Sequence, residues 1–259
     1  MRFNLIGPFE IVCDDGEVRL PTTPKVCQTL ALLLTRPNEV VPAELLIQEL
    51  WGDRPPRSAH ATVQTYIHQA RRVLEPCWTG EDQLLVTRPL GYLIQVPRDD
   101  VDITLFERLV DRAGAELERR MPDAAARSLR SALALWRGPV LSSVPTGQIL
   151  GGRVAHLAEL RIRALELRIE ADNQLGRHRE NIPELRSLVH DYPLNEWFHG
   201  QLIHALHRAG RRAEALQAYQ SLYRILSTEL GLEPSTELQH LQLAVLDPSG
   251  AHRPATLGA

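Results

Sequence analysis

The sequence predicts an α+β domain followed by an all-α domain within 259 residues. In residues 1–97, short stretches of alternating apolar residues flank three segments with helical periodicity. In residues 98–246 the periodicity is helical almost throughout, and part of the pattern repeats after 34 residues. Residues 247–259 contain too little apolar surface to pack, so we expect a disordered tail there.

Strands and two helices are expected at the start of the first domain. Apolar residues alternate in residues 2–12, which predicts one strand with a bulge or bend at Gly7-Pro8. Residues 17–20 return as a second strand after an Asp-Asp-Gly turn. Pro24 suits the first turn of a helix, and Pro42 opens a second helix.

A third helix and a hairpin complete the first domain. Ser58 is a favourable N-cap for a helix that continues to residue 74. Residues 84–87 and 92–96 then pair as strands around a tip that begins with Arg88. A helix that can enter the major groove of DNA, followed by a hairpin that can touch the minor groove, is typical of a winged helix.

The third helix has one apolar and one polar face. The apolar face, which we expect in the core, comprises Val63, Ile67, Ala70 and Leu74. Short polar side chains can donate to and accept from base edges. The candidates for base readout are Thr62, Gln64, Thr65 and His68. Arg71 and Arg72 follow at the C-terminal end, where arginine suits phosphates. A solvated helix face has a similar composition, but the order of the elements favours DNA.

Further cations lie around this helix. Arg88 is a candidate for the minor groove, although an arginine in a surface turn is the ordinary alternative. Lys25, Arg54 and Arg57 are candidates for flanking phosphates. The formal net charge of the chain is −3, and residues 1–99 hold 10 basic against 12 acidic residues. Residues 54–98 hold 6 against 3, so the positive charge is local and predicts weak non-specific affinity.

The helical domain carries an internal repeat. Ile169, Ala171, Gly176, Arg177 and Leu188 recur 34 residues later as Ile203, Ala205, Gly210, Arg211 and Leu222. This period, with small residues inside a helix pair and glycine at the turn, is typical of tetratricopeptide repeats. Residues 105–117 and 124–136 form a degenerate earlier pair, and residues 138–152 are expected to be a loop. Pro183 predicts a kink or a late helix start.

Several classes of protein find no support. No run of residues is apolar enough for a membrane span, and the first residues do not resemble a signal peptide. Cys13, Cys27 and Cys77 lack metal-ligand spacing, so we expect buried thiols in a reduced cytoplasm. Three histidines share a predicted helix without a carboxylate or cysteine to complete a metal site: His199, His204 and His207. No catalytic motif is present, and we expect no enzyme activity.

An ordered set of sequence motifs resembles the actinobacterial antibiotic regulatory proteins, the SARP family. In the first domain they are TPKVCQTLALLLTRPNEVV, ELWGDRPPRSA, TVQTYIHQARRVL and RPLGYLIQV. In the second they are LALWRGPVL, VHDYPLNEWFHGQLIHALHRAGRRAEALQAYQ and TELGLEPS. The resemblance covers about residues 1–246. It implies an OmpR-like winged helix at 1–97 and an all-helical, tetratricopeptide-like bacterial transcriptional activation domain at 98–246.

The resemblance also implies a function. Members of the family activate antibiotic and other secondary-metabolite gene clusters, bind direct repeats near the promoter −35 region and contact RNA polymerase holoenzyme. Tandem sites imply self-association on double-stranded DNA as a head-to-tail dimer. The loop expected to face polymerase is Trp51, Gly52, Asp53, Arg54, Pro55, Pro56 and Arg57. The P-loop of larger members is missing, so no nucleotide or other cofactor is expected.

Two alternative functions remain open at this point. The slightly acidic first domain would suit a tetratricopeptide adaptor whose winged helix binds protein. A repressor would bind the same DNA and block polymerase. The proline-stiffened loop favours activation, but a fold does not decide the direction of regulation.

Overall fold

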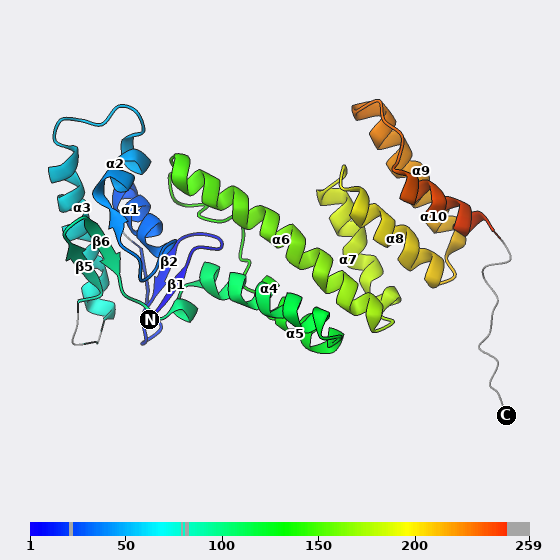
Figure 1. Ribbon diagram of the computed structural model, residues 1–259, viewed down its shortest axis with the longest axis horizontal. Coiled ribbons are helices and arrows are strands. Elements are labelled where there is room, and N and C mark those ends of the chain that lie inside the picture. The colour runs from blue at the N-terminus through cyan, green and yellow to red at the C-terminus, as the bar shows by residue number, and fades with distance from the viewer. Residues whose placement is uncertain (21–22, 79, 81–82, 248–259) are drawn as a thin grey trace. The chain divides into compact units, whose positions relative to one another are not determined.

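The computed structural model describes residues 1–20, 23–78, 80 and 83–247 (Figure 1). The chain divides into two compact units, residues 1–168 and residues 169–259. The first unit therefore contains the predicted α+β domain together with the first part of the helical domain, and the predicted boundary at residue 97 falls inside it. The predicted tail lies, except for Asp247, outside the described residues.

The chain begins with a three-stranded antiparallel sheet. It consists of β1 (Arg2–Asn4), β2 (Glu10–Val12) and β3 (Val18–Arg19), in that order, and Phe3 lies opposite Ile11. The prediction of a single bulged strand over residues 2–12 is therefore wrong. Gly7 adopts a φ of +118°, which a side chain would strain, and the chain reverses there.

Three helices and a second sheet form the winged helix. The helices are α1 (Pro24–Leu34), α2 (Ala43–Trp51) and α3 (Ala59–Leu74), and Pro24 begins α1 as predicted. The strands are β4 (Val41–Pro42), β5 (Leu85–Arg88) and β6 (Gly91–Ile94), in the order β4-β6-β5, so that β5 is an edge strand. A Cβ on Gly91 would lie 2.0 Å from the carbonyl oxygen of Val41, so only glycine fits this position.

Short 3-10 helices precede β5 and follow β6 in the chain, and two longer helices come next. The 3-10 helices are η1 (Glu75–Cys77) and η2 (Arg98–Asp100). The longer helices are α4 (Asp102–Glu118) and α5 (Pro122–Leu133), which pack side by side (Figure 1). They occupy the place of the predicted degenerate helix pair.

A buried carboxylate at the start of α4 ties this helix to β1. Asp102 accepts hydrogen bonds of 2.8 Å from the backbone N–H groups of Leu5 and Ile6. These two amides belong to the chain reversal after β1, and the carboxylate satisfies them where a sheet partner would otherwise be needed. Burial raises the pKa of Asp102 to about 6, although the amides and Arg137 oppose that shift.

A second buried carboxylate ties α2 to α6 (Gln148–Gln174). Glu49 is 3% exposed and accepts hydrogen bonds from the backbone N–H groups of Ile149 at 2.9 Å and Leu150 at 3.0 Å. It also accepts from the N–H of Gly147 and from the side-chain amide of Gln28. Because this carboxylate caps the helix, α6 begins inside the segment 138–152, which the sequence predicts to be a loop.

In its described residues, 169–247, the second unit contains the end of α6 and four further helices. These are α7 (His178–Asp191), α8 (Glu196–Arg208), α9 (Arg212–Glu229) and α10 (Thr236–Leu246). The predicted 34-residue repeat is confirmed in the structure. Gly176 and Gly210 turn the chain with φ of +74° and +78°, and Ala171 and Ala205 are buried at equivalent positions.

Pro183 lies inside α7, which begins at His178. The prediction of a late helix start is therefore wrong. Proline removes one N–H donor, and the buried side chains of Ile182 and Leu185 beside it hold the helix against its neighbours. Among the described residues, no helix is long and apolar enough to cross a membrane.

Candidate nucleic-acid interface

Helix α3 has the two faces that its sequence predicts. Val63, Ile67, Ala70 and Leu74 are at most 2% exposed and face the core. The opposite face exposes Gln64, Thr65, His68 and Arg72. Burial of the apolar stripe holds the helix in place and leaves its polar side chains at the surface.

Two threonines on this face already donate a hydrogen bond. Thr62, which is half-buried, donates its hydroxyl to the carbonyl of Ser58 at 3.0 Å, and Thr65 donates to Ala61 at 3.1 Å. Their hydroxyl oxygens keep acceptor capacity. Ser58 occupies the predicted N-cap position, but its side chain caps no backbone N–H.

The two neighbouring arginines of α3 differ. Arg71 is half-buried and donates from Nε to the carbonyl of Leu85 at 2.9 Å and from Nη2 to the hydroxyl of Thr87 at 2.8 Å. Arg72 is exposed and has no hydrogen bond or ion pair within the described part of the chain. Sequence reasoning treated them alike because a helix pattern does not show which arginine meets β5.

The hairpin of β5 and β6 presents its tip to solvent. Arg88, at the end of β5, lies opposite Gly91 and is exposed, and Leu90 is 78% exposed. Within the residues that the structure places, Arg88 has no hydrogen bond or ion pair. Its charged group is therefore available to an external anion.

The remaining predicted cations lie near the end of α2. Lys25 donates from Nζ to the carbonyl of Leu50 at 2.5 Å and to Gln28 at 3.2 Å, so it completes the C-terminus of that helix. Arg54 and Arg57 are exposed and, in the described ranges, have no hydrogen-bond or ion-pair partner. Lys25 thus has a structural role that the sequence did not predict.

The loop between α2 and α3 is anchored at its start and exposed beyond it. The ring of Trp51 stacks on Tyr66 of α3, with ring centroids 6.3 Å apart and an interplanar angle of 21°. Gly52 turns the chain with a φ of +59°, and residues 52–58 are exposed. The stacked pair fixes where the loop leaves α2, and Pro55-Pro56 stiffens the middle of the loop.

A hollow of about 340 Å³ lies between the C-terminal half of α3 and β5. Its polar and aromatic lining is His68, Arg71, Arg72, Glu75, Trp78 and Gln83. Sequence analysis missed Trp78 and Gln83, because they follow the helix without a periodic pattern.

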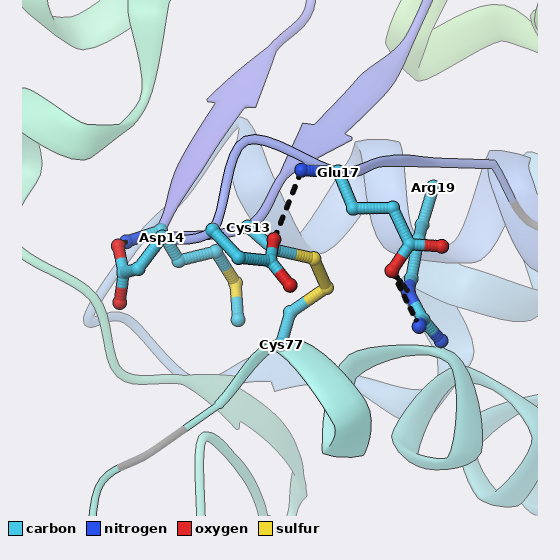
Figure 2. The surroundings of a disulfide bond; sticks show 7 residues. Cys13, Asp14, Glu17, Arg19 and Cys77 are labelled. Carbon is cyan, nitrogen blue, oxygen red and sulfur yellow. Dashed lines mark hydrogen bonds and ion pairs between the residues drawn. A yellow bond between two sulfur atoms is a disulfide. The ribbon is translucent and has the colours of Figure 1, made fainter.

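Cys13 and Cys77 form a disulfide with Cα atoms 4.8 Å apart (Figure 2). The prediction that these two cysteines are buried thiols is therefore wrong. Cys13 directly follows β2, and Cys77 ends η1 just beyond α3. The two residues are separated by 64 positions, so sequence spacing did not reveal the pair. Glu17 and Arg19 form an ion pair of 2.7 Å beside it (Figure 2). The third cysteine, Cys27, lies in α1, and burial raises the pKa of its thiol.

The three histidines of α8 lie in different surroundings. His199 is buried and its Nε2 lies 3.0 Å from the carbonyl of Pro193, and burial lowers its pKa. His204 packs edge-on against His178, with ring centroids 5.4 Å apart. His207 is not part of either contact. Among the described residues, no group of three or more His, Cys, Asp or Glu side chains is placed to hold a metal ion.

Comparison with known proteins assigns both parts of the chain. The family model described as "Transcriptional regulatory protein, C terminal" matches residues 16–94, and the "Bacterial transcriptional activator domain" matches residues 101–246. EmbR of Mycobacterium tuberculosis, solved in complex with a low-affinity phosphopeptide, superimposes with a TM-score of 0.86 and 30% identity. That match covers 95% of this chain and 64% of EmbR.

Relatives of known role give the same assignment. The regulatory protein DnrI of Streptomyces peucetius is 41% identical over 95% of this chain and 92% of its own length. The regulator RedD of Streptomyces coelicolor is 33% identical over 96% of this chain and 71% of its own length. AfsR of Streptomyces coelicolor is 37% identical over 97% of this chain, which spans only 25% of AfsR. With its OmpR-like winged helix and helical activator domain, the chain belongs to the SARP family of transcriptional activators.

Proposed function

We propose that this chain binds direct repeats in double-stranded DNA near the −35 region of promoters of an antibiotic or secondary-metabolite gene cluster and recruits RNA polymerase holoenzyme. The observation that carries the proposal is the exposed polar face of α3, flanked by two arginines, Arg72 and Arg88, that have no partner in the described part of the chain. We place this function in the cytoplasm.

The base-reading group lies towards the N-terminal half of α3. Gln64 and His68 project from the exposed face, and each offers a donor and an acceptor to a base edge. Thr65 and Thr62 add acceptor oxygens and methyl groups, which suit close apolar contact with thymine.

The phosphate-binding group is made of exposed arginines. Arg72 follows the base-reading residues on α3, and Arg54 and Arg57 lie on the loop before that helix. Arg88 extends from the wing towards the minor groove. Lys25 and Arg71 add positive charge nearby, but each already donates two hydrogen bonds within the protein.

Tandem binding follows from the direct repeats. Two winged helices on one face of DNA require half-sites about 10 base pairs or a multiple apart. Such neighbours meet head to tail, so the pair on DNA lacks two-fold symmetry. Residues 51–57 supply the polymerase contact in this proposal, because the loop is exposed and held at Trp51.

A footprint on promoter fragments, with and without polymerase holoenzyme, tests the proposal. We expect protection of repeats on one DNA face, strengthened by polymerase, and more run-off transcript when the protein is added. Asp53→Ala, at an exposed loop position outside the phosphate-binding group, should reduce the extra protection that polymerase gives, whereas Asp14→Ala, at an exposed aspartate after β2, should not. Reduced transcript with normal protection would show a repressor, and no protection at low salt would favour the protein adaptor.

A further inference from the structure

Arg71 joins α3 to β5, which pairs on one side only within the described sheet. The backbone N–H of Gln95 donates to Leu84, so in the antiparallel β5–β6 pair the next residue, Leu85, directs its carbonyl away from β6. Since β5 is an edge strand, no further strand within the described residues supplies a donor on that side. Nε of Arg71 supplies it at 2.9 Å.

The second hydrogen bond of Arg71 lies closer to the wing tip. Nη2 donates at 2.8 Å to the hydroxyl of Thr87, the residue immediately before Arg88. A guanidinium group is planar and its donors have fixed directions, so two bonds to Leu85 and Thr87 set both the distance and the angle between α3 and β5.

We propose that Arg71 is a positioning residue that holds the wing, the hairpin of β5 and β6, so that Arg88 reaches the DNA. This inference rests on the proposed DNA binding. In this proposal two of the five N–H donors of Arg71 serve β5, and its role is to hold the wing rather than to bind a phosphate. Arg72 provides the contrast on the same helix, since it is exposed and makes no hydrogen bond or ion pair in the described ranges.

The first test needs no DNA and uses hydrogen exchange of the full chain. Arg71→Ala should speed exchange of the ladder amides of β5 and β6 roughly tenfold, because a charge-assisted link to the edge strand is lost. Thr87→Val, which removes only the second bond, should speed it less, and Arg72→Ala should leave it unchanged. Equal exchange in Arg71→Ala and the unmodified chain would overturn the proposal.

The second test is a double-mutant cycle on a 30-base-pair duplex selected from a random pool by the unmodified chain. Arg71→Ala and Arg88→Ala should each weaken binding about fivefold, and the double variant should bind as Arg88→Ala alone. Arg72→Ala combined with Arg88→Ala should multiply the two losses. A multiplied loss for Arg71 and Arg88 would show an independent phosphate contact and refute the positioning role.

A conservative variant and a failure control complete the design. Arg71→Lys keeps the charge without the planar pair of donors, so it should bind as weakly as Arg71→Ala. Full affinity in Arg71→Lys would show that charge alone matters and would overturn the proposal. If the unmodified chain enriches no sequence, the proposed function fails, and hydrogen exchange still decides whether Arg71 holds the wing.

Discussion

Replacing Glu49 by alanine should destabilise the first unit more than any surface change on α2. The variant leaves three backbone N–H groups at the start of α6 without their acceptor. The side-chain amide of Gln28 loses one of its two bonds and keeps the one to the backbone carbonyl of residue 49. Each buried donor left unsatisfied costs ~1–3 kcal/mol, and water that enters the vacated space offsets part of this. We expect a loss of about 4 kcal/mol in the free energy of unfolding.

Urea denaturation of the full chain, followed by tryptophan fluorescence, measures this loss. Its midpoint should fall while the slope of free energy against urea stays constant, since the surface exposed on unfolding is unchanged. Glu44→Ala, at an exposed position in the first turn of the same helix, is the matched control and should lose at most ~1 kcal/mol. An equal loss in the two variants would refute the role assigned to Glu49.

Three further changes test separate features. Burial raises the folded pKa of Asp102 to about 6, so protonation of this carboxyl group favours the folded state. This stabilisation is fully present below the unfolded pKa and is lost as the pH rises through about 6. The free energy of unfolding should therefore fall by roughly 2–3 kcal/mol between pH 4 and pH 7, measured by urea titration. Reduction of the Cys13–Cys77 disulfide, which spans 64 positions, should lower the free energy of unfolding by about 4 kcal/mol, measured with and without reductant. Gly91→Ala should lower the melting temperature by several degrees, since its Cβ would meet a carbonyl at 2.0 Å.

Each of these predictions has a control. Asp102→Asn should lack the pH-dependent term, and a constant difference from the unmodified chain would contradict that assignment. Cys27→Ser should keep the effect of reductant, and detection of all three thiols by alkylation without reductant would exclude the disulfide. Gly114→Ala lies in α4 with open space around the new Cβ and should be neutral or stabilising.

Local patterns predicted much of the fold because they depend on neighbouring residues. Pro24 at the start of α1 and the repeated glycines at 176 and 210 are signals that a single segment carries. The 34-residue period indicated the helix pairs for the same reason. The two faces of α3 followed from its 3.6-residue periodicity, so the exposure of Gln64, Thr65 and His68 was predicted correctly. The contacts of these residues and of the half-buried Thr62 with DNA stay a prediction.

Pairings across long stretches of chain could not be predicted. Arg71 and Arg72 have the same chemistry and adjacent positions, and only the path of β5 decides which one is engaged. The sequence predicted Lys25 as a phosphate contact and gave no sign of its partner in the structure, the carbonyl of Leu50. Every residue possesses such a backbone group, so it leaves no signal in the sequence. The reversal at Gly7 depends on amides that Asp102 satisfies from almost 100 positions away. Sequence spacing alone does not distinguish such a reversal from a bulge.

The two buried carboxylates affect how members of this family can be recombined. A chimera that exchanges residues 1–97 separates Asp102 from the amides of Leu5 and Ile6, and Glu49 from the first turn of α6. At both places the carboxylate and the backbone N–H groups then come from different proteins, and their relative positions are no longer set by one chain. A junction within α6 near residue 168 keeps both contacts on one side of the cut and transplants the first unit whole.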